Sequence, residues 1–166
     1  METIETARLR LLPVRVEHAE EMTGVLADQR LHTYIGGTPD DEAALRARYR
    51  RWAAGSPDRA VTWGNWVIEL RADGGLVGTV QATITGASAA IAWVVGTRWQ
   101  GRGIATEAAR GLFDWLRSRE VHTVLAHIHA DNAASAAVAC ALGLRATGEQ
   151  QDGEVRWRWA AHDDSE

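Results

Sequence analysis

The chain has 166 residues, 46% hydrophobic and 24% charged, a composition typical of a soluble globular protein of one domain. Its net charge of −4 gives a nucleic-acid partner no overall electrostatic support, and no apolar run approaches the ~20 residues that span a membrane. The N-terminus lacks the apolar core of a signal peptide, and one cysteine, Cys140, excludes an internal disulfide, so we expect a single cytoplasmic domain over residues 1–166.

The first half of the chain predicts two helices and three strands. Alternation predicts a strand over residues 3–13, and helical spacing predicts a helix over residues 16–30, followed by a loop. Thr38 and Pro39 are typical of a helix start, so a second helix should run from there to about residue 54. Residues 61–85 read as a β-hairpin with its turn at residues 72–75, where Asp and Gly are typical of turns.

The second half predicts a parallel pair of strands. A buried strand at residues 91–95, a helix over residues 104–119 and a strand at residues 121–129 form a βαβ unit, whose strands should be parallel. A fourth helix covers residues 133–142, a hairpin covers residues 144–161, and the acidic end of the chain reads as a frayed tail. We therefore expect an α+β fold with four helices and a mixed, mostly antiparallel sheet of six to seven strands.

The segment between residues 95 and 104 has the features of an anion site. Gly101 and Gly103 precede a helix, whose first amide N–H groups lack partners and whose dipole is positive there, and Arg102 adds a charge. The chain contains no lysine, which excludes a Walker loop, and Thr106 stands where a dinucleotide fingerprint requires glycine. A phosphate or pyrophosphate is the expected ligand, and a tight turn without a ligand is the alternative that the loop alone leaves open.

Two segments resemble the GCN5-related N-acetyltransferase (GNAT) superfamily. Residues 100–105 (Gln-Gly-Arg-Gly-Ile-Ala) are similar to the signature that cradles the pyrophosphate of acetyl-CoA in that family. Residues 132–144, with Asn132, Ser135 and a final Leu-Gly-Leu, resemble its Asn-x-x-Ser stretch. Residues 6–11 are similar to the RimJ/RimL-like branch, whose members acetylate ribosomal protein N-termini and whose relatives act on small amines and antibiotics.

The resemblance implies a GNAT-like fold and an enzyme that moves the acetyl group of acetyl-CoA to a primary amine by direct attack in a ternary complex. The acceptor would be a small molecule or a protein N-terminus, and an acidic chain without an evident recognition patch favours the small molecule. The resemblance also implies which residues hold the cosubstrate: Trp93, Val94, Val95, Gln100, Gly101, Arg102, Gly103, Ile104, Ala105, Asn132 and Ser135.

Two positions depart from the family pattern. Ala90 and Ala139 stand where many relatives carry a glutamate and a tyrosine for proton transfer. A non-catalytic acyl-CoA-binding module is therefore the alternative function, and a plain nucleotide-binding module is a third. A homodimer is left open, and neither nucleic acid nor a membrane is expected as a partner.

Other side chains could supply the missing proton transfer. Ser135, on the matching helix face, could protonate the thiolate or bind the coenzyme, or contact only backbone. His129 shares a strand face with His127 and could relay a proton from the amine, although packed or surface histidines are the alternative. No third ligand at recognisable spacing accompanies them, so no metal site is expected.

Aromatic residues are candidates for the acceptor side. By the same resemblance, Tyr34, Trp63 and Trp66 belong to segments that flank the acceptor in this family. Aromatic walls suit a small amine that is cationic or partly apolar. Simple core packing is the alternative for each tryptophan.

Overall fold

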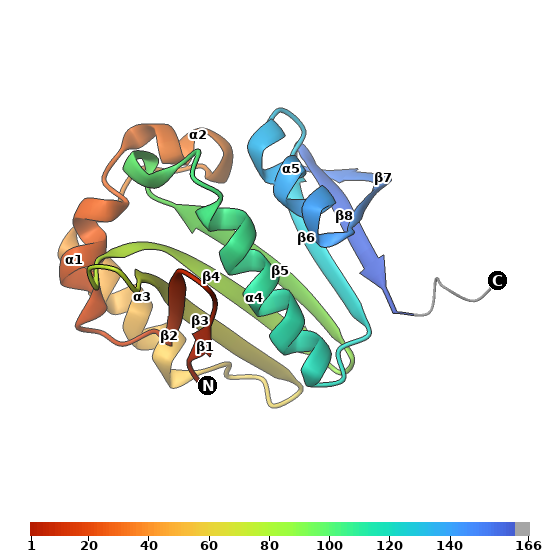
Figure 1. Ribbon diagram of the computed structural model, residues 1–166, viewed down its shortest axis with the longest axis horizontal. Helices are drawn as coiled ribbons and strands as arrows, with labels where there is room; N and C mark the ends of the chain where they lie inside the picture. The colour runs from red at the N-terminus through yellow and green to blue at the C-terminus, as the bar shows by residue number, and fades with distance from the viewer. Residues whose placement is uncertain (162–166) are drawn as a thin grey trace.

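The computed structural model describes residues 1–161, apart from the side chain of Ile35, and the predicted acidic tail at residues 162–166 lies outside this part of the chain. Residues 1–161 form five α-helices, two short 3-10 helices and one sheet of eight strands (Figure 1). The strands are β1 (Ile4–Glu5), β2 (Leu9–Pro13), β3 (Val61–Leu70), β4 (Leu76–Thr85), β5 (Ser88–Val95), β6 (Thr123–His129), β7 (Arg145–Gln151) and β8 (Glu154–Ala160). The helices are α1 (His18–Val25), η1 (Gln29–Leu31), α2 (His32–Ile35), α3 (Glu42–Ala54), η2 (Thr97–Trp99), α4 (Ile104–Ser118) and α5 (Ala133–Leu142).

The sheet has the order β1-β2-β3-β4-β5-β6-β8-β7, and the direction of strand pairing changes near its middle. Every neighbouring pair is antiparallel except β5 and β6, which are parallel, as the βαβ pattern predicts. These two strands pair only over Ser88–Ala90 and Thr123–Leu125. Figure 1 shows them meeting at one end and separating toward the other. The mixed α+β fold is confirmed, and the separation leaves a gap in the sheet.

Helices cover both faces of the sheet. On one face lie α4 and α5, and on the other lie α1 and α3 (Figure 1). The apolar stripe of α4, which includes Leu112 and Leu116, is buried against the strands because its residues recur at helical spacing. A second cluster, around Met22, Tyr49 and Val67, fills the space between α1, α3 and the sheet.

The N-terminal third departs from the predicted elements. The strand expected over residues 3–13 breaks into β1 and β2, because the Thr6 N–H donates to the Leu9 carbonyl (2.9 Å) and closes a turn. This split accounts for a count of eight strands instead of six to seven. The first helix ends at Val25, since Gly24 weakens its last turn, and η1 and α2 replace the expected loop. Asp41, not Thr38, caps α3 by accepting from the Ala44 N–H (2.8 Å).

Gly78 on β4 lies where β5 approaches so closely that no side chain fits. A Cβ atom at this position would stand 2.2 Å from the Val94 carbonyl oxygen. We expect Gly78→Ala to lower the free energy of unfolding by about 1–3 kcal/mol, as overpacking does. Urea unfolding measures this, with Gly24→Ala as the control, since a Cβ there meets nothing within 4 Å. The control should raise stability by about 0.5–1 kcal/mol; a Gly78→Ala protein as stable as the unaltered chain would contradict the close approach.

Candidate active site

Two adjoining cavities occupy the gap between β5 and β6. The larger has a volume of about 670 Å³ and the smaller about 390 Å³. Both are lined by Tyr34 of α2, Trp93 and Val94 of β5, and Asn132 and Ser135 at the start of α5. The two cavities share these walls and lie against opposite faces of the sheet, the larger beside α3 and the smaller beside α4 and α5. We refer to the two cavities together as the passage. Its size is that of a small-molecule site.

The smaller cavity lies against the glycine loop. The loop and the start of α4 line it, and Arg102 is not among the lining residues. Gly101 (φ +77°) and Gly103 (φ +76°) are both left-handed, a conformation that side chains disfavour. Gly103 is the N-cap of α4, so the amide N–H groups of the first turn lack intrahelical partners at this wall. A cradle of free amides without a Cβ at Gly101 fits a diphosphate, as the loop sequence predicts.

Two side-chain amides predicted to bind the cosubstrate also hold the site together. The Gln100 Nε2 donates to the Val95 carbonyl (3.0 Å), which ties the loop back to β5. Asn132 caps α5, as its Oδ1 accepts from the Ser135 N–H (3.1 Å) and its Nδ2 donates to the Ser135 hydroxyl (3.1 Å). Within residues 1–161 that hydroxyl donates to no backbone group, so its hydrogen is available to a ligand in the passage.

The larger cavity has an aromatic and charged wall made by α3. The rings of Tyr49 and Trp52 stack with their centroids 5.3 Å apart. Burial raises the pKa of Tyr49 well above its usual range, so the phenol stays neutral, and within residues 1–161 its buried hydroxyl has no hydrogen-bond partner. Arg48 and Asp40, which also line the cavity, form an ion pair (3.1 Å). The sequence analysis did not predict this wall, although the apolar spacing of Leu45, Tyr49 and Trp52 was an available signal.

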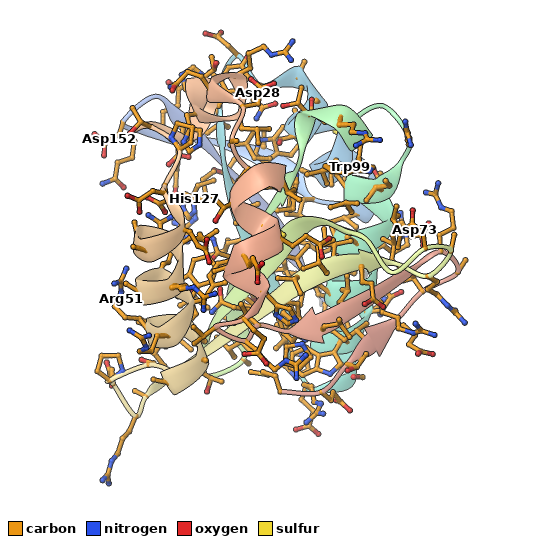
Figure 2. The ribbon with its side chains drawn as sticks, turned by 90° about the vertical axis from the view of Figure 1, so that its left-hand side faces the viewer. Asp28, Arg51, Asp73, Trp99, His127 and Asp152 are labelled. Atoms are coloured by element: carbon orange, nitrogen blue, oxygen red, sulfur yellow. The ribbon has the colours of Figure 1, made fainter. Side chains whose placement is uncertain are left out.

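The two histidines of β6 share the larger cavity but differ in their contacts. The Nδ1 of His129 accepts from the Asp131 N–H (3.1 Å), so the neutral ring carries its hydrogen on Nε2. Its ring contacts that of Tyr34 (centroids 5.2 Å apart), which joins α2 to β6 across the passage. His127 is exposed on the side of the sheet that carries α3 (Figure 2), and its ring makes no hydrogen bond within residues 1–161. The ring nitrogens of His127 are therefore free of hydrogen bonds within residues 1–161, whereas the Nδ1 of His129 already accepts one and lies 4.0 Å from the Asp131 carboxylate.

The three aromatic residues predicted to flank the acceptor differ in their position relative to the cavities. Tyr34 lines both cavities, whereas Trp63 lines neither. Trp66 is fully buried, packs edge-on against Trp115 (5.2 Å between centroids) and donates from its Nε1 to the Glu2 carbonyl (2.9 Å). It faces α4, on the side of the sheet away from the α3 wall, and it lines neither cavity. Core packing explains it.

Comparison with known proteins identifies the family. A family model described as an acetyltransferase (GNAT) domain matches residues 8–145. The chain belongs to the GNAT acetyltransferase family. Among solved structures, a GNAT-family acetyltransferase from Bacillus anthracis is 19% identical with a TM-score of 0.83, covering 96% of this chain and 99% of the other. RimJ of Mycobacterium smegmatis, in complex with CoA-disulfide, is 22% identical with a TM-score of 0.81, covering 99% and 90%. At these identities the likeness shows the fold, and no curated protein sequence matches.

This GNAT acetyltransferase lacks titratable groups at the two positions where its sequence departs from the family pattern. Ala90 pairs with Leu125 at the last parallel rung, and Ala139 is fully buried. Within residues 1–161 no cluster of three or more His, Cys, Asp or Glu side chains could hold a metal ion. In the same part of the chain, no helix combines the length and the apolar character needed to cross a membrane. Other side chains with exchangeable protons line the larger cavity, among them His127, His129 and Ser135.

Proposed function

We propose that the chain is an N-acetyltransferase that moves the acetyl group of acetyl-CoA to a primary amine by direct attack in a ternary complex. The observation that carries this proposal is the passage through the sheet, which joins a diphosphate-shaped cradle to a separate cavity of about 670 Å³. Two substrates can enter such a passage from opposite faces and meet at its middle. MccE, a structural neighbour 17% identical to the chain, is solved in complex with acetyl-CoA and AMP, which supports the proposal.

The chain's own residues divide the work of holding acetyl-CoA. Gly101, Gly103 and the first amides of α4 hold the diphosphate, and the edge of β5 from Trp93 to Val95, which does not pair with β6, offers main-chain groups to the pantetheine arm. The thioester supplies an activated acetyl group and a thiolate leaving group. Main-chain N–H groups of β5 directed into the passage would stabilise charge on the carbonyl oxygen.

Proton transfer is assigned to two side chains. His127 takes the proton that the attacking amine must lose, because its ring nitrogens are not engaged, whereas the Nδ1 of His129 already accepts from the Asp131 N–H. His129 instead orients the wall through its contact with Tyr34. Ser135 lies where the two cavities meet and donates its hydroxyl hydrogen toward the departing sulfur.

The acceptor is proposed to be a small amine. The larger cavity is bounded by α2, α3 and the sheet, and its stacked aromatic rings and the Asp40 carboxylate suit an amine that is cationic or partly apolar. A protein N-terminus is the alternative acceptor. The cytoplasmic location, the single domain and the homodimer stay predictions.

The test is thiol release from acetyl-CoA with a panel of alkyl amines, aryl amines, amino acids and peptides with a free N-terminus. We expect turnover with at least one small amine and tighter binding of coenzyme A than of ATP. Coenzyme A binding without turnover on any acceptor would favour the non-catalytic acyl-CoA-binding module that Ala90 and Ala139 suggest. Tighter binding of ATP would favour a nucleotide-binding module.

A further inference from the structure

The turn between β1 and β2 docks on the first turn of α4, far away in the sequence. The Thr6 hydroxyl donates to Oε2 of Glu107 (2.5 Å), and the Arg8 N–H donates to the same oxygen (2.9 Å). The Arg8 Nε donates to the other carboxylate oxygen, Oε1 (2.7 Å). Both oxygens of Glu107 are therefore held by the N-terminal turn.

The same arginine reaches the glycine loop. Its Nη1 donates to the carbonyl of Arg102 (3.0 Å). A Cβ built on Gly103 would lie 3.4 Å from its Nη2, so the guanidinium also lies against the backbone of Gly103. Arg8 thus links Glu107 to the loop residues that immediately precede α4, and it limits how the peptide between Arg102 and Gly103 can rotate.

The contact between Arg8 and Glu107 also affects the charge beside the proposed diphosphate site. Glu107 lies in the first turn of α4, next to the amides proposed to hold a diphosphate. Partial burial raises the pKa of Glu107, but the hydrogen bonds from Thr6 and Arg8 outweigh it and lower the pKa overall, so the side chain is ionised at neutral pH. An unpaired carboxylate there would repel an anion, and the positive charge of Arg8 offsets it.

We infer that Arg8 is a positioning residue of the cosubstrate site, which holds the loop at Arg102 and Gly103 in the shape that binds a diphosphate and neutralises the nearest carboxylate. This inference rests on the proposed function, since the diphosphate is that of acetyl-CoA. It assigns a role to the β1–β2 turn, which lines neither cavity.

The test compares Arg8→Gln with Arg10→Gln. Arg10 lies two residues along, on β2, and pairs with Glu5 (3.2 Å) and Glu69 (3.4 Å), and none of these contacts reaches the loop, so it is a matched control. We expect Arg8→Gln to raise the calorimetric Kd for coenzyme A by about tenfold or more, the value of one charge-assisted contact. The KM for acetyl-CoA should rise in parallel while kcat and the KM for the amine stay unchanged, and the control should stay within about twofold.

A double variant tests whether the uncompensated charge of Glu107 contributes to the loss of coenzyme A binding. Arg8→Gln with Glu107→Gln removes both charges, so we expect it to bind coenzyme A more tightly than Arg8→Gln alone. If Arg8→Gln does not fold, Arg8→Lys replaces it. Its Kd for coenzyme A should exceed that of the unaltered chain, because lysine keeps the positive charge but lacks the planar guanidinium that contacts Glu107 and Arg102 together. A folded Arg8 variant with the Kd of the unaltered chain would overturn this inference alone. Failure of the unaltered chain to bind coenzyme A would overturn the proposed function.

Discussion

Replacing Gly103 by valine should weaken coenzyme A binding by about 100-fold or more, which corresponds to ~2.7 kcal/mol. Gly103 has a φ of +76°, and a β-branched residue is a genuine outlier in that conformation. The loop would change shape, and the amides of the first turn of α4 would no longer converge on one anion. The branched side chain would also crowd the Arg8 guanidinium, because its Cβ alone would lie 3.4 Å from Nη2. Backbone strain and a disturbed Arg8 contact would therefore both act on the loop that the sequence predicts to bind a phosphate.

The control for this prediction is Gly86→Val. Gly86 has a φ of +61°, lies in the turn between β4 and β5, and has no atom within 4 Å of the place that a Cβ would take. Both variants strain the backbone in the same way, but only one does so at the cradle. Calorimetry gives the Kd for coenzyme A and urea unfolding gives the stability of each protein. Normal affinity in a folded Gly103→Val protein would refute the assignment of the loop.

The second large effect is expected at His127. His127→Gln should lower kcat by about 100-fold, the lower end of what a positioned general base contributes, because glutamine keeps hydrogen bonding but cannot take up a proton. The Kd for coenzyme A should not change, since His127 lines only the larger cavity. Steady-state kinetics with an amine from the panel above measures kcat.

His129→Gln is the matched control on the same strand face. Its Nδ1 already accepts from the Asp131 N–H, and its ring contacts Tyr34, so we expect a change of less than about tenfold in kcat. A larger loss in His129→Gln than in His127→Gln would reverse the assignment of the base. Equal activity of His127→Gln and the unaltered chain would remove His127 from the mechanism.

Some elements could be predicted closely because their signals are local. The predicted bounds of β4 and α5 agree with the structure, since β4 follows a Gly-Gly turn and α5 lies between the cap at Asn132 and Gly143. The glycine loop was likewise recognisable, because the left-handed conformations at Gly101 and Gly103 require that residue type.

The side of the sheet on which a residue lies was harder to predict than the positions of the helices and strands. Residues 64–68 of β3 are buried on both sides of the sheet, so alternation could not show that Trp66 faces α4. The apolar stripe of Leu45 and Tyr49 in α3, which packs against the sheet, was not recognised among the arginines of that helix. His127 and His129 were correctly placed on one face, but their difference depends on a backbone N–H that only the folded turn at Asp131 brings near.

The sequence by itself determined the succession of a strand, a glycine turn and a helix within an α+β chain and predicted an anion site there, because turns, caps and periodicity act between residues a few positions apart. The tertiary structure alone decided where β5 and β6 separate, which side chains line the passage, and that Arg8 contacts both Glu107 and the glycine loop. These features depend on contacts between segments distant in the chain, whose pairing is selected by the packing of the whole sheet and its helices.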